Sequence, residues 1–478
     1  MMLTDMKKLN LLCLLVLSVS IGSLRAQNLN SAYFLEGYTY GHQLNPAKDY
    51  ERQGFVSMPF ILGNANISTM GNVSGKNFLF PLANGKVATF LHPDISVQQA
   101  LGDLKDFERS NTDLRYDIIG VGFHSNKGKG YNFLNLGVRA NMSFKLPYGI
   151  FEVMKDLQNK DYVIGDMGVS EQSWIELSGG HSHQISKGWR VGGTLKVLLG
   201  AAQARVNATN LRMQLQGADK WTVTGNMNAE VGVKGFTWGA PETEVCHDGT
   251  TYERIKADNI DVDKVGLNGF GLALDLGAEL DLEKEGLLKG MKISASLLDL
   301  GFIKWNNVAT AHNVSPTWEF GGFQNIKIKD GDGETFDDQT KRIGDNIGKL
   351  YNLQDGGTVG KARMLGATFN LGVEYKLPAY DKLKFGLLST TRIQGRYTWN
   401  EERLSATVSP LPWLEGGVNF GVGTFGASFG WIVNVHTKGF SIFAGMDRCM
   451  GKFSKQGVPL KADNNISVGI SFPFGKKL

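Results

Sequence analysis

Long stretches in which apolar residues alternate with small or charged ones constrain this chain most. The segments at 268–282 (NGFGLALDLGAELDL) and 365–377 (LGATFNLGVEYKL) keep this period of two throughout, as does the last segment at 464–474. Successive side chains of a β-strand point to opposite faces, so each segment has one apolar face. A globular strand usually has about 5–6 residues, whereas a tilted membrane-crossing strand needs about 9–11. The pattern therefore predicts strands with one face toward lipid and the other toward a barrel interior.

The alternation predicts an all-β fold, a transmembrane antiparallel β-barrel of about fourteen strands. The segment 114–123 also alternates and needs a partner, for which 86–91 is the candidate; this pair would raise the count to sixteen. The soluble alternatives are a β-sandwich or a β-helix, whose strands would be shorter and would bury their apolar faces against one another. We expect the fourteen strands at 131–144, 172–184, 189–203, 205–216, 220–233, 268–282, 291–303, 363–376, 383–393, 401–408, 413–423, 425–436, 439–449 and 464–474.

The N-terminus predicts export from the cytoplasm. Lys7 and Lys8 precede an apolar run at 9–21, and Leu24, Arg25 and Ala26 end a short polar stretch. This is the pattern of a signal peptide over residues 1–26, cleaved after Ala26 and too short to span a membrane. We expect the mature protein in the cell outer membrane, with membrane lipid as its partner. The net charge of +4 and the lack of basic blocks argue against a nucleic-acid partner.

Connection lengths predict the orientation of the barrel. The connections at 145–171, 234–267 and 304–362 are long, whereas those on the other side are short turns such as 185–188. In outer-membrane barrels the short turns are periplasmic. Tryptophans at strand ends also favour a membrane barrel, because such barrels carry aromatic girdles at both interfaces. We expect one girdle from Trp189, Trp221 and Trp413 and the other from Trp238, Trp305 and Trp399.

The region 27–113 is less regular than the barrel region assigned to 114–478. A helix is expected at 94–107, where Ser96 can cap the first turn and apolar residues form one stripe. The region has two interpretations that the pattern does not separate. It is a hatch or plug inside the lumen, or it is a periplasmic flap or additional strands.

Charged residues on the non-apolar strand faces are candidates for the lumen lining. A charge facing lipid near the midplane would be costly, so these side chains should point inward. Both signs occur, which suits either a salt-bridged, plugged interior or a polar pore. The candidates are Arg139, Arg190, Lys196, Asp275, Glu279, Asp281, Glu374 and Lys376.

No motif predicts an enzyme. GASFG (426–430) has the spacing of a nucleophile elbow around Ser428, but that motif needs a strand, a sharp turn and a helix. Here the strand alternation continues through the motif. Catalytic groups should converge, and none do in this pattern, so we expect no catalytic residues and no cofactor.

Two segments are weak candidates for metal binding. His181 and His183 share one strand face and could hold a transition metal if a neighbour supplied a third ligand. The segment 330–341 begins like a calcium loop, but its sixth residue is Thr335 and its twelfth is Lys341, so it departs from the EF-hand pattern. Strand-end histidines and an acidic surface loop are the simpler interpretations, and we expect no metal site.

Two cysteines remain after the signal peptide. The expected topology places Cys246 in the loop 234–267 and Cys449 at the top of a strand, both on the extracellular side. A disulfide could persist there, but it requires Cα atoms within about 7 Å. Two separate thiols are the alternative.

Several segments resemble a known group of proteins. HQLNPA (42–47), SLLDLGFIKW (296–305), TTRIQGRYTWNEERLSA (390–406) and SKQGVPL (454–460) are similar to uncharacterised secreted proteins of the Bacteroidetes type. These are grouped with barrels similar to long-chain fatty-acid transporters, the FadL-like superfamily. The resemblance implies a fourteen-stranded barrel with an N-terminal hatch in the lumen and passage of a hydrophobic solute. It carries over no site residue.

Two functional classes follow from these patterns. The first is a transport channel for a hydrophobic or other small solute. The second is a structural or docking barrel whose extracellular loops bind a partner without transport. Liposome swelling with sugars and with fatty acids would separate them.

Overall fold

The computed structural model of the chain describes residues 29–477. The described range excludes the segments 59–62, 73–78, 83–86, 126–128, 218–219, 247–248, 256–259, 263–265, 283–288, 322–334, 336–337, 340, 343–344, 346–351 and 450–463. The signal-peptide segment 1–26, most of the acidic segment 330–341 and the motif at 454–460 therefore lie outside the described residues. In the described part, no helix is long and apolar enough to span a membrane.

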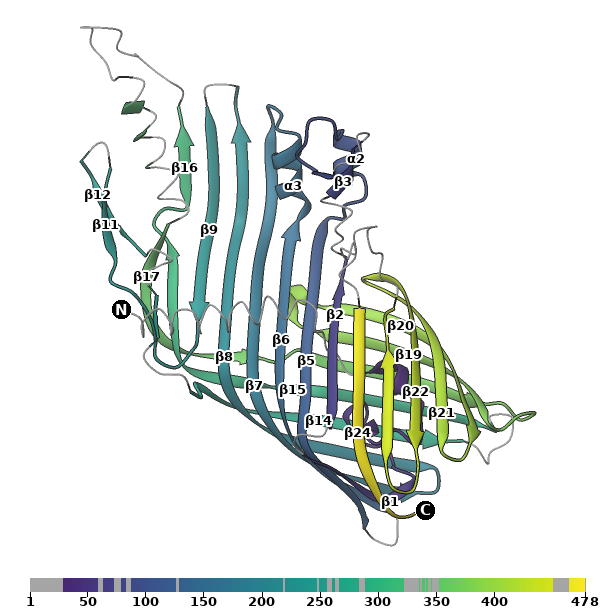
Figure 1. The fold of residues 1–478 in the computed structure, drawn as a ribbon. Helices are drawn as coiled ribbons and strands as arrows, with labels where there is room; N and C mark the ends of the chain where they lie inside the picture. The colour runs from purple at the N-terminus through teal and green to yellow at the C-terminus, as the bar shows by residue number, and fades with distance from the viewer. Residues whose placement is uncertain are drawn as a thin grey trace.

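In the described part of the chain, one antiparallel sheet of eighteen strands forms the wall of the molecule and closes on itself (Figure 1). The ring closes where β24 and β5 both pair with β1 and β2. The sheet strands are β1 (Arg52–Ser57), β2 (Asn64–Gly71), β5 (Phe107–Ser125), β6 (Gly130–Pro147), β7 (Asp161–Ser186), β8 (Trp189–Leu215), β9 (Trp221–Val231), β14 (Gly269–Asp281), β15 (Met291–Asn313), β16 (Thr317–Phe320), β17 (Leu353–Met364), β18 (Ala367–Lys376), β19 (Leu383–Ile393), β20 (Trp399–Leu411), β21 (Leu414–Gly423), β22 (Gly426–His436), β23 (Ser441–Met446) and β24 (Asn464–Lys477).

The eighteen described strands occupy fourteen positions around the ring, because four positions hold two strands end to end. β1 and β2 share one position between β24 and β5. β9 and β14 share another, since both pair with β8 on one side and with β15 on the other. β15 and β16 line up along β9, and β17 and β18 line up along β15. The prediction of a barrel of about fourteen strands is confirmed.

Some individual strand predictions were wrong although the total was right. The segments 189–203 and 205–216 form the single strand β8, so no turn occurs at 204. The segments 220–233 and 268–282 share one position rather than two. The strand predicted at 114–123 is β5, and it pairs with β1, β2 and β6 instead of 86–91.

The two faces of the wall differ as the alternation requires. On β14, Phe270 and Leu274 are exposed on the outside (53% and 38%), whereas Asp275 between neighbouring leucines is buried (2%). On β24, Ile466 is exposed and Ser467 is buried. The outer surface is therefore an apolar band of the kind that faces lipid, and the inner face carries the small and charged residues.

The tryptophans expected in the two girdles differ in exposure, and Trp238 is partly buried with its indole donating to the Thr310 carbonyl (3.0 Å). Trp189 and Trp413 lie exposed at the short-turn end (44% and 45%). Trp305 and Trp399, expected in the second girdle, are buried (0% and 2%) because they point inward. Trp221 begins β9 and lies at the end opposite Trp189, because β8 continues without the turn that the sequence suggested.

The region 27–113 divides into three parts in the structure. Residues 29–51 lie inside the barrel and include the turns η1 (Asn30–Ala32) and η2 (Gly41–Gln43). Residues 52–71 supply β1 and β2 to the wall, so the barrel includes strands well before position 114. Residues 79–82 and 87–104 lie outside the ring at the long-loop end (Figure 1).

The part at the long-loop end has a small apolar core of its own. It contains β3 (Leu79–Pro81), β4 (Val87–Thr89) and α2 (Val97–Leu101), which pack with α3 (Tyr148–Lys155). Ser96 caps α2 as expected, but the helix is shorter than predicted because β5 already begins at Phe107. The remaining small elements are β10 (Phe236–Trp238), β11 (Glu242–Val245), β12 (Thr251–Arg254), β13 (Ile260–Val262) and η6 (Gly395–Tyr397).

Candidate functional site

The candidate site is the barrel lumen, which residues 29–51 occupy; we name these residues the lumen segment. All residues from 29 to 47 except Glu36 are buried. The segment folds as irregular turns, and one of them forms where the Asn45 side chain accepts a hydrogen bond from the Ala47 backbone (2.9 Å). Asn followed by Pro favours such a turn, which explains why NPA does not continue a strand or helix.

Glycines on the inner wall make room for the lumen segment. A Cβ atom at Gly192 or Gly277 would collide with Pro46 or Asn45. A Cβ atom at Gly386 would collide with the ring of Phe34. The wall strands β8, β14 and β19 thus present backbone at the points where the segment passes. The small residues on the inner face of the wall therefore leave the space that the lumen segment occupies.

One end of the lumen segment is held by Asp447, which follows β23. The Asp447 carboxylate accepts hydrogen bonds from the backbone N–H groups of Asn30 (2.8 Å) and Ser31 (2.6 Å). Arg403 donates to the Asp447 carbonyl (3.0 Å), and Asn419 donates to the Ser31 hydroxyl (2.8 Å). Asp447 thus satisfies the free N–H groups at the start of η1, as an N-cap residue would.

The other end is held by charged groups near the short turns. Lys384 contacts Glu36 (2.5 Å), and the Gly37 N–H donates to Glu415 (3.0 Å). His436, which is buried, lies 2.8 Å from Glu51. These contacts reach β19, β21 and β22, so the segment is attached to several wall strands rather than to one.

The middle of the segment packs on aromatic wall residues. His42 is buried (3%), and its ring lies 4.3 Å from that of Phe133 and 6.1 Å from that of Phe55, measured between centroids. The Asn135 amide donates to Nε2 of His42 (2.9 Å). Burial, together with the positive charge of Arg115, lowers the pKa of His42 to about 3. The imidazole is therefore neutral at pH 7.

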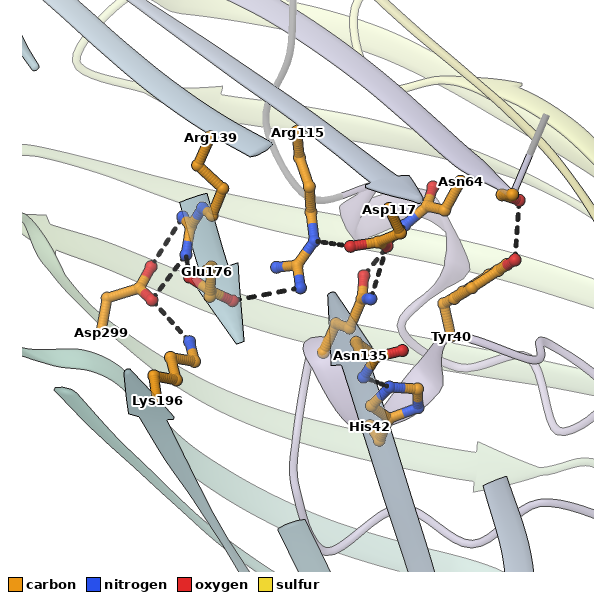
Figure 2. Close-up of polar contacts among 12 residues, drawn as sticks. Tyr40, His42, Asn64, Arg115, Asp117, Asn135, Arg139, Glu176, Lys196 and Asp299 are labelled. Atoms are coloured by element: carbon orange, nitrogen blue, oxygen red, sulfur yellow. Dashed lines mark hydrogen bonds and ion pairs between the residues drawn. The ribbon is translucent and has the colours of Figure 1, made fainter. Parts of the chain in front are cut away.

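Buried ions next to the segment connect several strands of the wall (Figure 2). Arg115 contacts Asp117 (3.1 Å) and Glu176 (3.5 Å). Arg139 contacts Glu176 (3.1 Å) and Asp299 (2.7 Å). The four strands involved are β5, β6, β7 and β15. β6 and β15 are separated by β7, β8 and β14, so the Arg139–Asp299 pair connects strands that are not neighbours in the sheet.

Lys196 completes this ion network. It contacts Asp275 (2.7 Å) and Asp299 (2.6 Å), and all three side chains are buried. The lumen segment joins the network through Gln43, which donates to Asp117 (2.7 Å). The network thus pairs its cations with carboxylates and leaves little open space between them.

Two cavities show where open space remains. One of about 20 Å³ lies within the ion network beside Asn30, Arg139 and Asp299, and it has room for about one water molecule. A larger one of about 620 Å³ lies toward the long-loop end. Its lining includes Lys145, Asp166, Leu211, Arg212, Asn226 and Thr317.

The structure places the predicted lumen residues as follows. Arg139, Lys196 and Asp275 meet in the ion network. Glu374 is buried 3.5 Å from Lys384.

The remaining candidates lie nearer the short-turn end. Arg190 contacts Asp49 (2.5 Å), and Lys292, which the sequence pattern did not single out, lies opposite Asp281 on one neighbouring strand and opposite Glu374 on the other. The charge of Glu279 also acts on Lys292, and that of Lys376 acts on Glu36.

The other candidates are not brought together into a site. His181 and His183 stack with ring centroids 5.7 Å apart, and His181 contacts Asn132 (2.8 Å). Among the described residues, no group of three or more potential ligands could hold a metal ion. Cys246 and Cys449 are separate free thiols, so the disulfide considered from the sequence is absent. Ser428 lies within β22, where no helix follows it.

Sequence reasoning missed four members of the ion network: Arg115, Asp117, Glu176 and Asp299. Glu176 lies on the inner face of β7 between Ile175 and Leu177, so the same alternation rule could have found it. Asp299 has no such signal. Asp299 has a positive φ of 59°, and the register of β14 on β15 shifts nearby. The inward–outward alternation of side chains is interrupted there, so it does not predict which face of the strand Asp299 is on.

Residues 46–447 match a family of unknown function (DUF5723). The chain belongs to this family. No curated protein matches the sequence.

Solved structures with similar folds include several barrels. The toluene transporter TodX of P. putida is 8% identical, with 95% of this chain and 96% of that chain covered and a TM-score of 0.39. A Pseudomonas aeruginosa FadL homologue is 10% identical, with 92% and 94% covered and a TM-score of 0.37. The translocator domain of the autotransporter NalP from Neisseria meningitidis is 9% identical, with 95% and 99% covered and a TM-score of 0.32. Such values carry no information about a solute or partner.

Proposed function

We propose that this protein conducts a small solute across the outer membrane and that the lumen segment closes the pathway. The observation that carries the proposal is that a separate segment of the chain, and not the wall side chains, fills the lumen. Wall side chains alone can fill a barrel of about eight strands, whereas wider barrels leave a lumen. Here the wall presents glycines such as Gly192 and Gly386 to the interior, and residues 29–51 fill the space beside them.

The attachments of the lumen segment suit a closure that can be released. The segment is bound by hydrogen bonds along its length, by ion pairs and by aromatic packing, and among the described residues its covalent connection to the wall is through β1. A barrel with a purely structural role would need no such separate piece. Binding of a partner by the loops at the long-loop end is the alternative function, which transport measurements can separate from the first.

A reversible cross-link between segment and wall tests the proposal. The hydroxyl oxygens of Thr39 and Ser471 lie 2.9 Å apart. We therefore suggest Thr39→Cys with Ser471→Cys, in a background in which Cys246 and Cys449 are serine. We expect liposomes containing the reduced protein to swell in a small solute, and we expect oxidation to stop the swelling. Sugars and fatty acids would be compared as solutes.

A matched pair within the wall provides the control. Thr69 on β2 and Thr112 on β5 have hydroxyl oxygens at the same separation of 2.9 Å, and neither belongs to the lumen segment. Oxidation of Thr69→Cys with Thr112→Cys should leave swelling unchanged. If oxidation of the Thr39 and Ser471 pair had no effect, the segment would not be the gate. If neither protein conducted any solute, the docking function would be favoured.

A further inference from the structure

A group of buried polar atoms without partners lies on the inner wall beyond the ion network, toward the long-loop end. Among the described residues, the unpaired atoms include Nη1 of Arg363, Nε1 of Trp305, Oη of Tyr397 and both amide atoms of Gln203. These four side chains are between 0% and 6% exposed. Buried polar atoms in folded proteins are nearly always paired, so this concentration indicates a missing partner.

The strand register brings these residues to neighbouring positions of the wall. Trp305 on β15 lies opposite Lys361 on β17, two residues from Arg363. On the other side, Gln203 and Arg205 follow one another along the inner face of β8, and Arg205 lies opposite Glu230 on β9. β9 and β17 both pair with β15, so the residues form one continuous region. We name it the donor patch: Gln203, Arg205, Trp305, Lys361, Arg363 and Tyr397.

The donor patch has excess positive charge. Glu230 contacts both Lys361 (2.7 Å) and Arg363, so one carboxylate serves two cations. Arg205 is near enough to act electrostatically on Arg363 and on Tyr397. Glu171 is the second carboxylate on which the charge of Arg363 acts, so three cations share two carboxylates. In the ion network of Figure 2, by contrast, each cation contacts two carboxylates.

We propose that the donor patch binds a small oxyanion, with a carboxylate or phosphate group as the recognised chemistry. A guanidinium and an indole offer only N–H donors, a phenol offers one O–H donor, and the amide of Gln203 offers two N–H donors besides its acceptor oxygen. Oxyanions accept several hydrogen bonds at once and form the strongest ones with cationic donors. The free Nη1 of Arg363 and the free Nε1 of Trp305 supply donors of the kind that such a group requires.

The surroundings favour a compact polar ligand over a hydrophobic one. The apolar side chains near Trp305 are Ile303, Val308 and Leu365, which are buried against one another in a single cluster. Because these apolar side chains are buried against one another, a ligand at the patch would contact its polar groups and not an apolar surface. Binding of the anion does not depend on transport, whereas a role for the patch in selecting the solute rests on the proposed function.

Calorimetric titration of the purified full-length protein in detergent at low ionic strength tests the inference. The probes are inorganic phosphate, succinate and an uncharged sugar. We expect phosphate, succinate or both to bind and the sugar not to bind; the two anions show whether a phosphate or a carboxylate is preferred. If neither anion bound, only water would occupy the patch and the inference would be wrong, whatever the transport assays showed.

Three substitutions connect the binding to the patch. Arg363→Gln should weaken anion binding roughly tenfold or more, and Tyr397→Phe should weaken it less, because hydrogen bonds from charged donors are stronger. Glu230→Gln should instead tighten binding, by roughly tenfold, because it removes a competing carboxylate.

General damage to the barrel would not strengthen binding, so the Glu230→Gln result separates a site from misfolding. Lys160→Gln, at an exposed ion pair outside the patch, is the control and should leave affinity unchanged. Equal affinities in all four variants would overturn the assignment. If Arg363→Gln failed to fold, the opposite effects of Tyr397→Phe and Glu230→Gln would still decide it.

Discussion

Arg139 donates two parallel hydrogen bonds to the carboxylate of Asp299, at 2.7 and 2.9 Å, although the two residues are 160 positions apart. Arg139 belongs to β6 and Asp299 to β15, and three strand positions separate these strands in the ring. The pair therefore connects strands that are not neighbours in the sheet. Such bidentate geometry fixes direction as well as distance, so the pair limits how far the two strands can separate.

Asp299→Asn should destabilise the barrel strongly. The substitution keeps the size of the side chain, and asparagine tolerates the positive φ at this position. It leaves Arg139 and Lys196 buried with one carboxylate fewer, and removal of one partner from a buried ion pair costs about 3–5 kcal/mol. We expect a loss of that size in the free energy of unfolding, measured by urea titration of the barrel folded into lipid vesicles.

An exposed ion pair provides the control for this measurement. Glu152 contacts Lys160 at 2.7 Å, a distance as short as the Arg139–Asp299 contact, but Lys160 is exposed and Glu152 is partly exposed (43% and 27%). Exposed pairs contribute little to stability. Glu152→Gln should therefore leave the urea midpoint unchanged. Similar losses for both variants would mean that the lumen network is as hydrated as the surface.

The stability of the lumen segment should fall with acidification because of His42. Burial holds the pKa of His42 at about 3, below the value of about 6.5 expected in an unfolded chain. Between these two values the unfolded state binds a proton at His42 and the folded state does not. The stability contributed by neutral His42 is therefore complete above pH 6.5 and is lost as the pH falls from 6.5 to 3. We expect protease cleavage within residues 29–51 to accelerate across that interval.

His42→Gln separates this effect from the titration of carboxylates. Glutamine can accept the hydrogen bond from Asn135 but has no proton to gain. The variant should show a weaker pH dependence of cleavage than the wild type between pH 6.5 and 4. Identical pH profiles for the two proteins would show that His42 does not control the acid sensitivity of the segment.

Gly37→Ala should loosen the segment near the short turns. A Cβ atom at Gly37 would lie 2.8 Å from the His436 ring, closer than real contacts allow, and His436 is itself buried against Glu51. Overpacking of this kind typically costs about 1–3 kcal/mol. We expect faster solute entry in liposome swelling and a lower unfolding midpoint. Gly439→Ala, at a position with open space around it, should change neither.

The architecture could be predicted because it depends on a pattern that every strand repeats. Alternation at Leu272, Leu274 and Leu276 reports a face that must meet lipid, and this requirement applies at all fourteen positions. The boundaries of individual strands were predicted less accurately than their number. The continuous strand β8 and the interrupted position shared by β9 and β14 have the same local alternation, and only pairing across the sheet distinguishes them.

The candidate site depended on information that one strand does not carry. Arg139 and Lys196 could be placed inward from parity, but their partner Asp299 sits where the register shifts and φ is positive. The lumen segment is harder still, because its turns have no period. Its place follows from long-range contacts such as that between Asn30 and Asp447, which are 417 positions apart. The buried Trp305 misled the girdle assignment, because β15 continues to Asn313 and Trp305 is buried within the strand instead of lying at its end.

The lipid-facing band gives a final prediction that depends on depth. Leu274 lies near the middle of β14 and is exposed on the outer wall (38%). Leu280 lies on the same strand and the same face, opposite Trp189 at the short-turn interface. An arginine facing lipid costs about 2–4 kcal/mol at the midplane and about 0–1 kcal/mol near the interface. Leu274→Arg should therefore lower the free energy of unfolding in phospholipid vesicles much more than Leu280→Arg. Equal costs, or a larger cost at Leu280, would show that the membrane does not sit between the Trp189 interface and the long-loop end.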